Sequence, residues 1–145
     1  MELFVRRFDE LDIHDLYEIM KLRCDVFIVE QECHYEDIDG RDINAIHVYL
    51  KDDNEIVGYL RILDKGVVFK EVSIGRVIAK RRRVGIGSEL LKAGLKAAKK
   101  YYNADKIKIE AQVYAKSFYE RVGFKVCGAE FLEDGIPHVP MVVEL

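Results

Sequence analysis

Apolar side chains recur along the chain with two different periods, one typical of helices and the other of strands. Residues 12–29 carry apolar side chains at steps of three and four, which predicts a helix with one buried face. The same spacing predicts a second helix over residues 87–102, with lysines on its outer face. A third, shorter helix is predicted over residues 115–122, because Gly123 stands where a helix usually ends.

The stretches outside these helices are rich in β-forming residues. The turn Asp52-Asp53-Asn54 joins two of them as a hairpin. Extended segments are predicted over residues 3–8, 47–50, 56–63, 67–69, 72–79, 106–112, 124–127 and 139–143. The order of these elements predicts one α/β (α+β) domain over residues 1–145, with a mixed sheet and helices on both of its faces.

Composition fits a folded, soluble domain. Hydrophobic residues make up 50% of the chain and charged residues 34%, and no low-complexity tract is present. The formal net charge of -3 argues against a general nucleic-acid binder. The N-terminus lacks the apolar core of a signal peptide, and no apolar run approaches the length of a membrane span. We therefore expect a cytoplasmic protein without a membrane or nucleic-acid partner.

The three cysteines form no Cys-x-x-Cys pair, so we expect reduced thiols. Cys24 belongs to a helical apolar pattern and Cys127 to a predicted strand, so both are expected to pack into the core. Cys33 lies in a predicted loop. No spacing of potential ligands supports a zinc site or a calcium-binding loop, and we expect no metal.

A glycine-rich turn joins the predicted strand 72–79 to the helix that starts near Gly87. Such a turn is a good anion site, because the first N–H groups of a helix lack partners and the helix dipole favours negative charge. Gly85 and Gly87 allow close approach of the backbone, Ser88 adds a donor, and residues 80–83 are all basic. The turn lacks the lysine of a Walker loop and the third glycine of a dinucleotide fingerprint. On its own it indicates a ligand with several phosphates.

The pattern Arg82-x-x-Gly85-x-Gly87, after a strand and before an amphipathic helix, resembles motif A of the GNAT acetyltransferases. The segment Phe-Tyr-Glu-Arg-Val-Gly-Phe at residues 118–124 resembles a helix end of the same family. Further patterns at residues 23–31, 74–77 and 133–138 resemble the ElaA-type branch. The resemblance covers nearly the whole chain. It implies the GNAT fold, a mixed, twisted sheet splayed open at its centre, with acetyl-CoA in the split.

The resemblance also implies roles for individual residues. Tyr119 would stand beside the sulfur as general acid for the CoA thiolate. The strand end would pair with the pantetheine arm, and the turn would wrap the pyrophosphate. The turn from Ala79 to Arg82 is shorter than usual in the family, which leaves the contacts at the strand end open. The implied cofactor-binding residues are Val77, Ile78, Ala79, Arg82, Arg83, Val84, Gly85, Ile86, Gly87 and Ser88.

The general base is less well defined by the sequence. Counted back from the glycines, Glu71 matches the catalytic glutamate of histone-type relatives. Counted along the strand, across the shortened turn, the match falls on Ser73 instead. An ordinary exposed glutamate is the alternative explanation of Glu71.

The resemblance places four further residues near the acceptor: Glu30, Asp37, Asp39 and His138. Carboxylates there would hold a cationic amine and help to remove its proton. A solvated acidic loop is the alternative for residues 37–42, and a structural histidine is the alternative for His138. His47, at the start of a predicted strand, is expected to be structural.

These observations lead to two hypotheses of different kinds. The first is an enzyme that transfers the acetyl group of acetyl-CoA directly to a primary amine of a small molecule or peptide. The second is a CoA-binding regulatory or interaction module without catalysis. Tyr119 and the intact Gly-x-Gly favour the enzyme, and a homodimer is compatible with the sequence.

Overall fold

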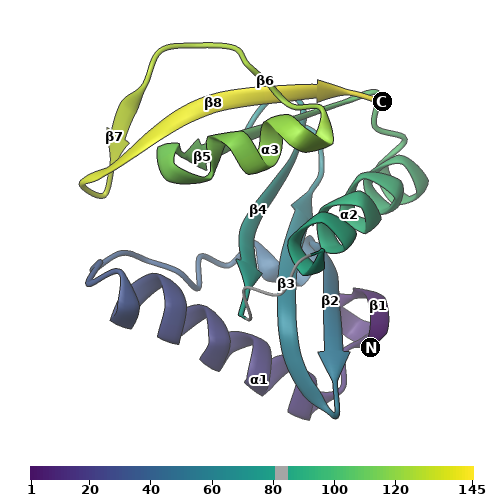
Figure 1. Cartoon of the computed structure of the whole chain (residues 1–145). Helices are drawn as coiled ribbons and strands as arrows, with labels where there is room; N and C mark the ends of the chain where they lie inside the picture. Colours follow the sequence, from purple (N-terminus) through teal and green to yellow (C-terminus); the bar gives the residue numbers. More distant parts are fainter. Residues whose placement is uncertain (81–84) are drawn as a thin grey trace.

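The computed structural model describes residues 1–80 and 85–145. Within them, eight strands form one sheet in the order β1-β2-β3-β4-β5-β8-β6, and β7 pairs with β8 (Figure 1). Only β4 and β5 run parallel among these pairs, so the sheet is mixed, as predicted. The strands are β1 (Glu2–Arg7), β2 (Ile46–Asp52), β3 (Glu55–Leu63), β4 (Val72–Ala79), β5 (Lys106–Gln112), β6 (Lys125–Val126), β7 (Phe131–Glu133) and β8 (Ile136–Glu144).

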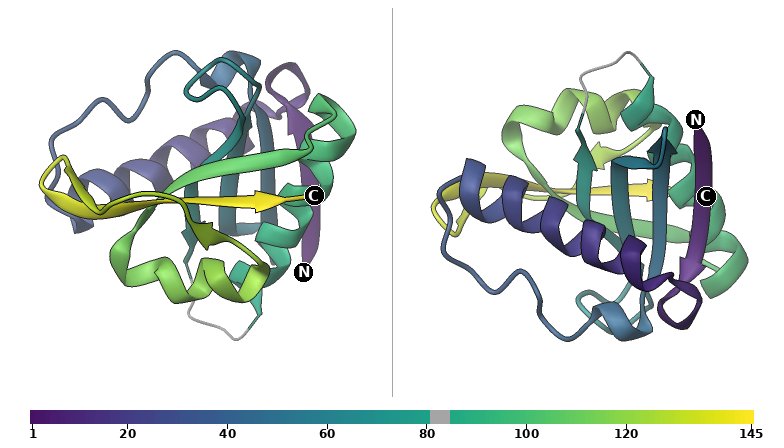
Figure 2. Two further views of the ribbon diagram at one scale, coloured as in Figure 1. Left: turned by 90° about the horizontal axis from the view of Figure 1, so that it is seen from above. Right: turned by 90° about the horizontal axis from the view of Figure 1, so that it is seen from below.

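Helices cover both faces of the sheet, which confirms the prediction (Figure 2). The helix α1 (Ile13–Arg23) lies on one face and continues as a π-helical segment, η2 (Cys24–Glu30). The helices α2 (Ile86–Tyr102) and α3 (Lys116–Val122) lie on the other face. Short 3-10 turns complete the set: η1 (Phe8–Glu10), η3 (Asp42–Asn44) and η4 (Val113–Ala115). No helix in the described part of the chain is long and apolar enough to cross a membrane.

Two hydrophobic clusters hold the helices on the sheet. Because successive side chains of a strand point to opposite faces, Leu60 belongs to the same cluster as Leu90 of α2, whereas Tyr59 belongs to the same cluster as Ile19 of α1. The central strands β2 and β3 are therefore buried on both faces, which explains their nearly continuous apolar sequences.

The sheet opens between β4 and β5. These two strands pair at only two positions, Val72 with Ile107 and Ser73 with Lys108. Beyond Ser73, β4 continues to Ala79 alongside β3, while β5 continues to Gln112 alongside β8. The sheet is thus two halves, β1–β4 and β5–β8, joined at one end (Figure 1). We call the region where β4 and β5 diverge the split; it confirms the splayed sheet.

Three details differ from the sequence predictions. Residues 67–69 form a turn and no strand, because Gly66 adopts a φ of 81° and its N–H donates to the Phe69 carbonyl at 2.8 Å. Cys24 and Cys127 are exposed, since one lies where α1 changes its winding and the other follows the two-residue strand β6; Cys33 is buried. The strand β7 is not predicted, because three residues are too few to show a period.

His47 is structural, as predicted. Its ring is fully buried, with Nδ1 2.7 Å from the Tyr59 hydroxyl and Nε2 2.9 Å from the backbone oxygen of Asp42. A neutral ring satisfies both contacts, accepting at Nδ1 and donating at Nε2. Burial lowers the pKa of His47 below its usual range.

The lowered pKa of His47 makes stability depend on pH. Because the folded-state pKa lies below the unfolded one, the stabilisation is complete above about pH 6.5 and is lost as the pH falls toward the folded-state value. We expect the melting temperature of the wild type to fall on acidification from about pH 7.5 to about pH 5.5. The same scan of His47→Gln is expected to have a smaller slope; an equal slope would show that other groups cause the dependence.

Candidate active site

Three elements converge at the open end of the split. The strand β4 ends at Ala79, and α2 begins just after Gly85. A Cβ atom on Gly87 would lie 3.1 Å from the ring of Phe118 in α3 and 3.9 Å from the Cβ of Ala79. The glycine at position 87 therefore lets α3 and the end of β4 approach the first turn of α2.

The first turn of α2 has the features of an anion site. Gly85 is its N-cap and adopts a φ of 98°, which disfavours any residue with a Cβ atom. The first hydrogen bond of the helix runs from the N–H of Glu89 to the carbonyl of Gly85 at 2.9 Å, so the preceding N–H groups lack helical partners. The other predicted residues of this cradle, Arg82, Arg83 and Val84, lie outside the described residues.

The strand β4 carries a bulge beside the split. Gly75 pairs with Arg61 and Ile78 pairs with Tyr59, so Arg76 and Val77 together oppose a single residue of β3. Arg76 adopts a φ of 54°, in the left-handed region. A bulge of this kind leaves one residue of the strand without a ladder partner. The irregularity falls at Val77, where the sequence predicts contacts between backbone and cofactor.

Tyr119 lies in α3 next to this region. Its ring packs edge-on against Phe118 and Phe124, with centroids 5.1 and 5.7 Å away, and only 9% of the residue is exposed. No described residue hydrogen-bonds to its hydroxyl. Burial, and next the neighbouring Tyr114, raise the pKa of Tyr119 above its usual value, so the hydroxyl is protonated at neutral pH. It can therefore act as a donor.

Three aspartates of the acidic loop after η2 are bound by arginines. Asp37 lies 3.0 Å from Nε of Arg23 and 2.8 Å from Nε of Arg76. Asp39 lies 2.6 Å from Nη2 of Arg61. Asp42, which the sequence analysis does not single out, lies 2.6 Å from Arg23 and 3.0 Å from Arg61. Three guanidinium groups and three carboxylates thus form one network beneath the sheet, which we call the Arg–Asp network.

The Arg–Asp network changes the role of two predicted residues. Only 3% of the Asp37 side chain and 12% of the Asp39 side chain are exposed. Hydrogen bonds and charge from the arginines, chiefly Arg61, lower the pKa of Asp39 despite the opposing effect of its burial. Both carboxylates are already engaged by arginines, so neither is free to bind an acceptor amine.

The acceptor side contains a second group of polar residues. Along β5, buried Ile107, Ile109 and Ala111 alternate with Glu110 and Gln112, which therefore face away from α2. The amide of Gln112 exchanges hydrogen bonds of 3.3 and 3.5 Å with Gln31, the residue after η2. The end of η2, where the exposed Glu30 lies, is thus attached to the far half of the sheet.

His138 and Glu110 share this face through β8. His138 pairs with Gln112 in the ladder, and Glu110 pairs with the residue two positions further along β8. The ring of His138 stacks on Phe131, its Nδ1 lies 2.7 Å from the Ile136 carbonyl oxygen, and its Nε2 lies 3.7 Å from a Glu133 carboxylate oxygen. Burial, and next the charge of Glu133, raise the pKa of Glu110. Glu110 is a candidate base that no sequence motif marks.

Glu71 is not near these residues. It precedes Val72, which pairs with Ile107 at the closed end of the split. Six residues of extended chain, roughly 20 Å, separate Glu71 from Val77. Ser73, the alternative match, is 5% exposed and also lies in the closed end. The structure therefore does not bring Glu71 together with the bulge or Tyr119.

Known proteins of similar sequence and structure identify the family of this chain. The profile of the acetyltransferase (GNAT) domain matches residues 17–145. The chain belongs to the GNAT acetyltransferase family. The crystal structure of Escherichia coli ElaA superposes with a TM-score of 0.90 and 34% identity, over 99% of this chain and 100% of that one. An acyl-CoA N-acyltransferase from Pseudomonas aeruginosa gives 0.89 and 32%, over 99% of both chains. A UPF0039 protein of Schizosaccharomyces pombe is 38% identical over 100% of this chain and 98% of its own length.

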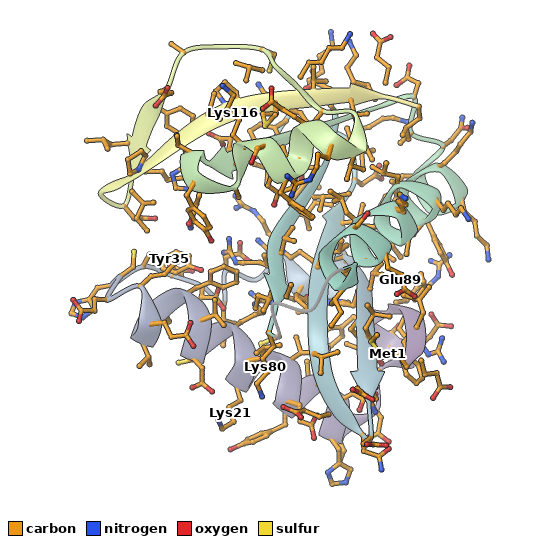
Figure 3. The ribbon with its side chains drawn as sticks, in the orientation of Figure 1. Met1, Lys21, Tyr35, Lys80, Glu89 and Lys116 are labelled. Carbon is orange, nitrogen blue, oxygen red and sulfur yellow. The ribbon has the colours of Figure 1, made fainter. Side chains whose placement is uncertain are left out.

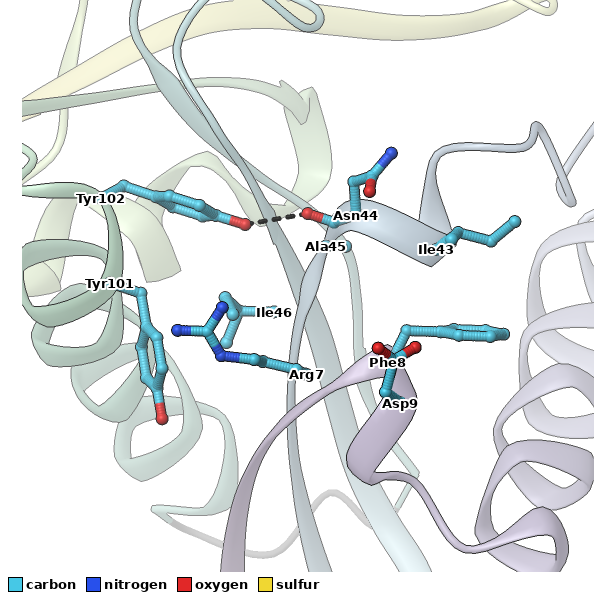
Figure 4. A pocket seen from close by; sticks show the side chains of 9 residues that line it. All are labelled: Arg7, Phe8, Asp9, Ile43, Asn44, Ala45, Ile46, Tyr101 and Tyr102. Carbon is cyan, nitrogen blue, oxygen red and sulfur yellow. Dashed lines mark hydrogen bonds between the residues drawn. The ribbon is translucent and has the colours of Figure 1, made fainter.

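One pocket lies apart from the split. It measures about 220 Å³ and sits between the end of β1, η3 and the end of α2 (Figure 4). There Tyr102 donates a hydrogen bond of 3.0 Å to the carbonyl of Asn44, and the Arg7 guanidinium lies over the ring of Tyr101. It shares no lining residue with the split.

Within residues 1–80 and 85–145, no group of three or more His, Cys, Asp or Glu side chains is arranged to hold a metal ion.

Proposed function

We propose that this GNAT protein is a cytoplasmic enzyme that transfers an acetyl group from acetyl-CoA to a primary amine. The observation that carries the proposal is the split, where the end of β4, the first turn of α2 and α3, the helix that carries Tyr119, come together. The acceptor is a small molecule or peptide, and the reaction requires no metal. The Pseudomonas aeruginosa protein of the same fold, described as an acyl-CoA N-acyltransferase, supports this reaction type.

The residues around the split fit the chemistry of acetyl-CoA. The backbone of Val77, Ile78 and Ala79 would pair with the pantetheine arm where β4 lacks a partner on the β5 side. The segment from Gly85 to Ser88 would hold the pyrophosphate with its free N–H groups, together with Arg82, Arg83 and Val84. The space beside Gly85 is open, so a phosphate can approach the backbone closely there.

Two side chains of the protein take part in the proton transfers of the reaction. The amine nitrogen forms a bond to the thioester carbonyl carbon, the carbon–sulfur bond breaks, and one proton moves from nitrogen toward sulfur. Glu110 accepts the proton that the amine loses, and Tyr119 donates to the sulfur as negative charge develops on it. The raised pKa of Tyr119 keeps its hydroxyl protonated at neutral pH, so the hydroxyl can donate a hydrogen bond to the departing thiolate.

The acceptor amine would enter between η2 and β8. Glu30 and Glu133 are exposed there, His138 lies beside Glu133, and Glu110 lies deeper along β5. This assignment keeps Glu30 and His138 from the sequence analysis, and Glu110 replaces Glu71 as the proposed base.

Two measurements test the proposed function. Acetyl-CoA at about 100 times its dissociation constant should stabilise the protein by about 2.7 kcal/mol, seen as a higher melting temperature. Release of free thiol from acetyl-CoA should then identify acceptors in a panel of polyamines, amino sugars and peptides. Stabilisation without turnover of any acceptor would favour the CoA-binding module. No stabilisation would contradict both.

Glu110→Gln tests the base. We expect kcat/KM to fall about 100-fold at neutral pH, because the amide cannot accept the amine proton. The wild-type rate should decline as the pH is lowered through a pKa above the usual glutamate range, since the pKa of Glu110 is raised. In Glu110→Gln this decline should be absent. Glu120→Gln, on the exposed surface of α3, is the control and should leave the rate and the profile unchanged.

A further inference from the structure

Arg76 has an unusual backbone conformation for its place in the fold. Six described residues other than glycine have a positive φ, and five of them lie outside the strands, in turns or at helix ends. Arg76 alone lies inside a strand, at the bulge of β4, with a φ of 54°. The left-handed region is unfavourable for a residue with a Cβ atom, so something must hold the backbone there.

The side chain of Arg76 is tightly held. Its Nε lies 2.8 Å from Oδ1 of Asp37, and its Nη2 donates to the backbone oxygen of Asp37 at 3.1 Å and to Asp39 at 3.4 Å. The guanidinium also lies 5.2 Å from the ring centre of Tyr35. Figure 3 shows Tyr35 on the side of the molecule where the two halves of the sheet separate.

The partners of Arg76 are themselves fixed by the rest of the Arg–Asp network. Asp37 is bound by Arg23 and Asp39 by Arg61. The loop that carries both carboxylates begins at Gln31, which bonds to Gln112 on the acceptor side. The bulge and the acceptor-side loop are thus connected through Arg76.

We propose that Arg76 is a positioning residue for acetyl transfer. Its guanidinium, clamped by Asp37 and Asp39, holds the β4 bulge so that the backbone N–H at Val77 faces the thioester carbonyl. This inference rests on the proposed function. It assigns to the two aspartates, in place of contact with the amine, the task of fixing the backbone that polarises the acetyl group.

Loss of the guanidinium should affect the bulge more than the fold. In Arg76→Ala, Asp37 keeps Arg23 and Asp39 keeps Arg61, so neither carboxylate loses all of its partners. The backbone at position 76 loses its restraint and moves toward regular pairing. A displacement of about 1 Å near the reacting atoms can cost about 100-fold in rate.

The test compares Arg76→Ala with a matched control. We expect kcat to fall at least about tenfold, while KM for acetyl-CoA changes less than about threefold because the glycine turn is untouched. The control is Lys51→Ala. Lys51 forms an ion pair with Asp15, and its side chain is 19% exposed, against 20% for Arg76. Both variants should lose stability, and only Arg76→Ala should lose kcat; equal kcat values in the two would overturn the proposal.

Arg76→Gly separates conformation from charge. Glycine adopts the left-handed φ without steric cost, so we expect a kcat several-fold above that of Arg76→Ala. A glycine variant no faster than the alanine variant would overturn the conformational role. If Arg76→Ala does not fold, Arg76→Lys replaces it, because one ammonium cannot reproduce the forked contacts of the guanidinium. An unchanged kcat in Arg76→Lys would likewise overturn the proposal.

An inactive wild type would refute the proposed function and the inference with it, whereas an active wild type with unaffected Arg76 variants would refute the inference alone.

Discussion

Replacing Arg23 with methionine is expected to lower the free energy of unfolding by about 3–5 kcal/mol. The Arg23 side chain is completely buried and binds both Asp37 and Asp42. Without it, the buried carboxylates of Asp37 and Asp42 each keep only one arginine partner, Arg76 and Arg61 respectively. The unfolding midpoint should fall by about 10–20 °C in a thermal melt followed by circular dichroism.

Lys21→Met is the control for this prediction. Lys21 lies on the same helix, and its ion pair with Asp25 is largely exposed, at 66% and 49% for the two side chains. Exposed pairs contribute little to stability, so the midpoint of this variant should hardly move. If Arg23→Met melted within a few degrees of Lys21→Met, the Arg–Asp network would not be the stabilising centre we infer.

Tyr119→Phe is expected to lower kcat about 100-fold with little change in KM for acetyl-CoA. The substitution removes only the hydroxyl, and the ring contacts with Phe118 and Phe124 remain. Stability should change little, because no described residue hydrogen-bonds to that hydroxyl. Steady-state thiol release with the best acceptor of the panel measures both constants.

Tyr17→Phe is the matched control for the loss of one phenol hydroxyl. Tyr17 lies on α1 and is 73% exposed, so its variant should keep the wild-type kcat. A Tyr119→Phe variant as fast as Tyr17→Phe would remove Tyr119 from the transfer step and leave it as a packing residue of α3.

The sequence predicts the elements well because helices and strands have different apolar periods. The helix α2 shows this most clearly, since its buried and exposed positions alternate with the helical repeat and its start is only one residue before the predicted position 87. The sequence does not predict the π-helical winding of η2, because this segment keeps the apolar spacing of an ordinary helix. The splayed sheet follows from resemblance to the family and from no local pattern.

The candidate site is predictable only in part. The glycine turn and Tyr119 stand in contiguous motifs, so their sequence context identifies them. The Arg–Asp network joins Arg23 to partners 14 and 19 residues away in a segment without any period, so only the folded chain reveals it. Glu110 occupies a polar position of an alternating strand, and its chemical meaning depends on Glu133 and His138 brought close by β8. Matching Glu71 by residue count does not show at which end of β4 it lies, and the structure places it at the closed end of the split.

We expect acetyl-CoA to bind in the split. Titration of the ¹⁵N-labelled protein with acetyl-CoA, followed by amide resonances, tests it directly. We expect the largest shifts at the β4 bulge and strand end and at the first turn of α2, namely at Val77, Ile78, Ala79, Gly85, Ile86, Gly87 and Ser88. Shifts confined to other surfaces, such as the pocket between β1 and η3, or no shifts at saturating acetyl-CoA, would contradict it.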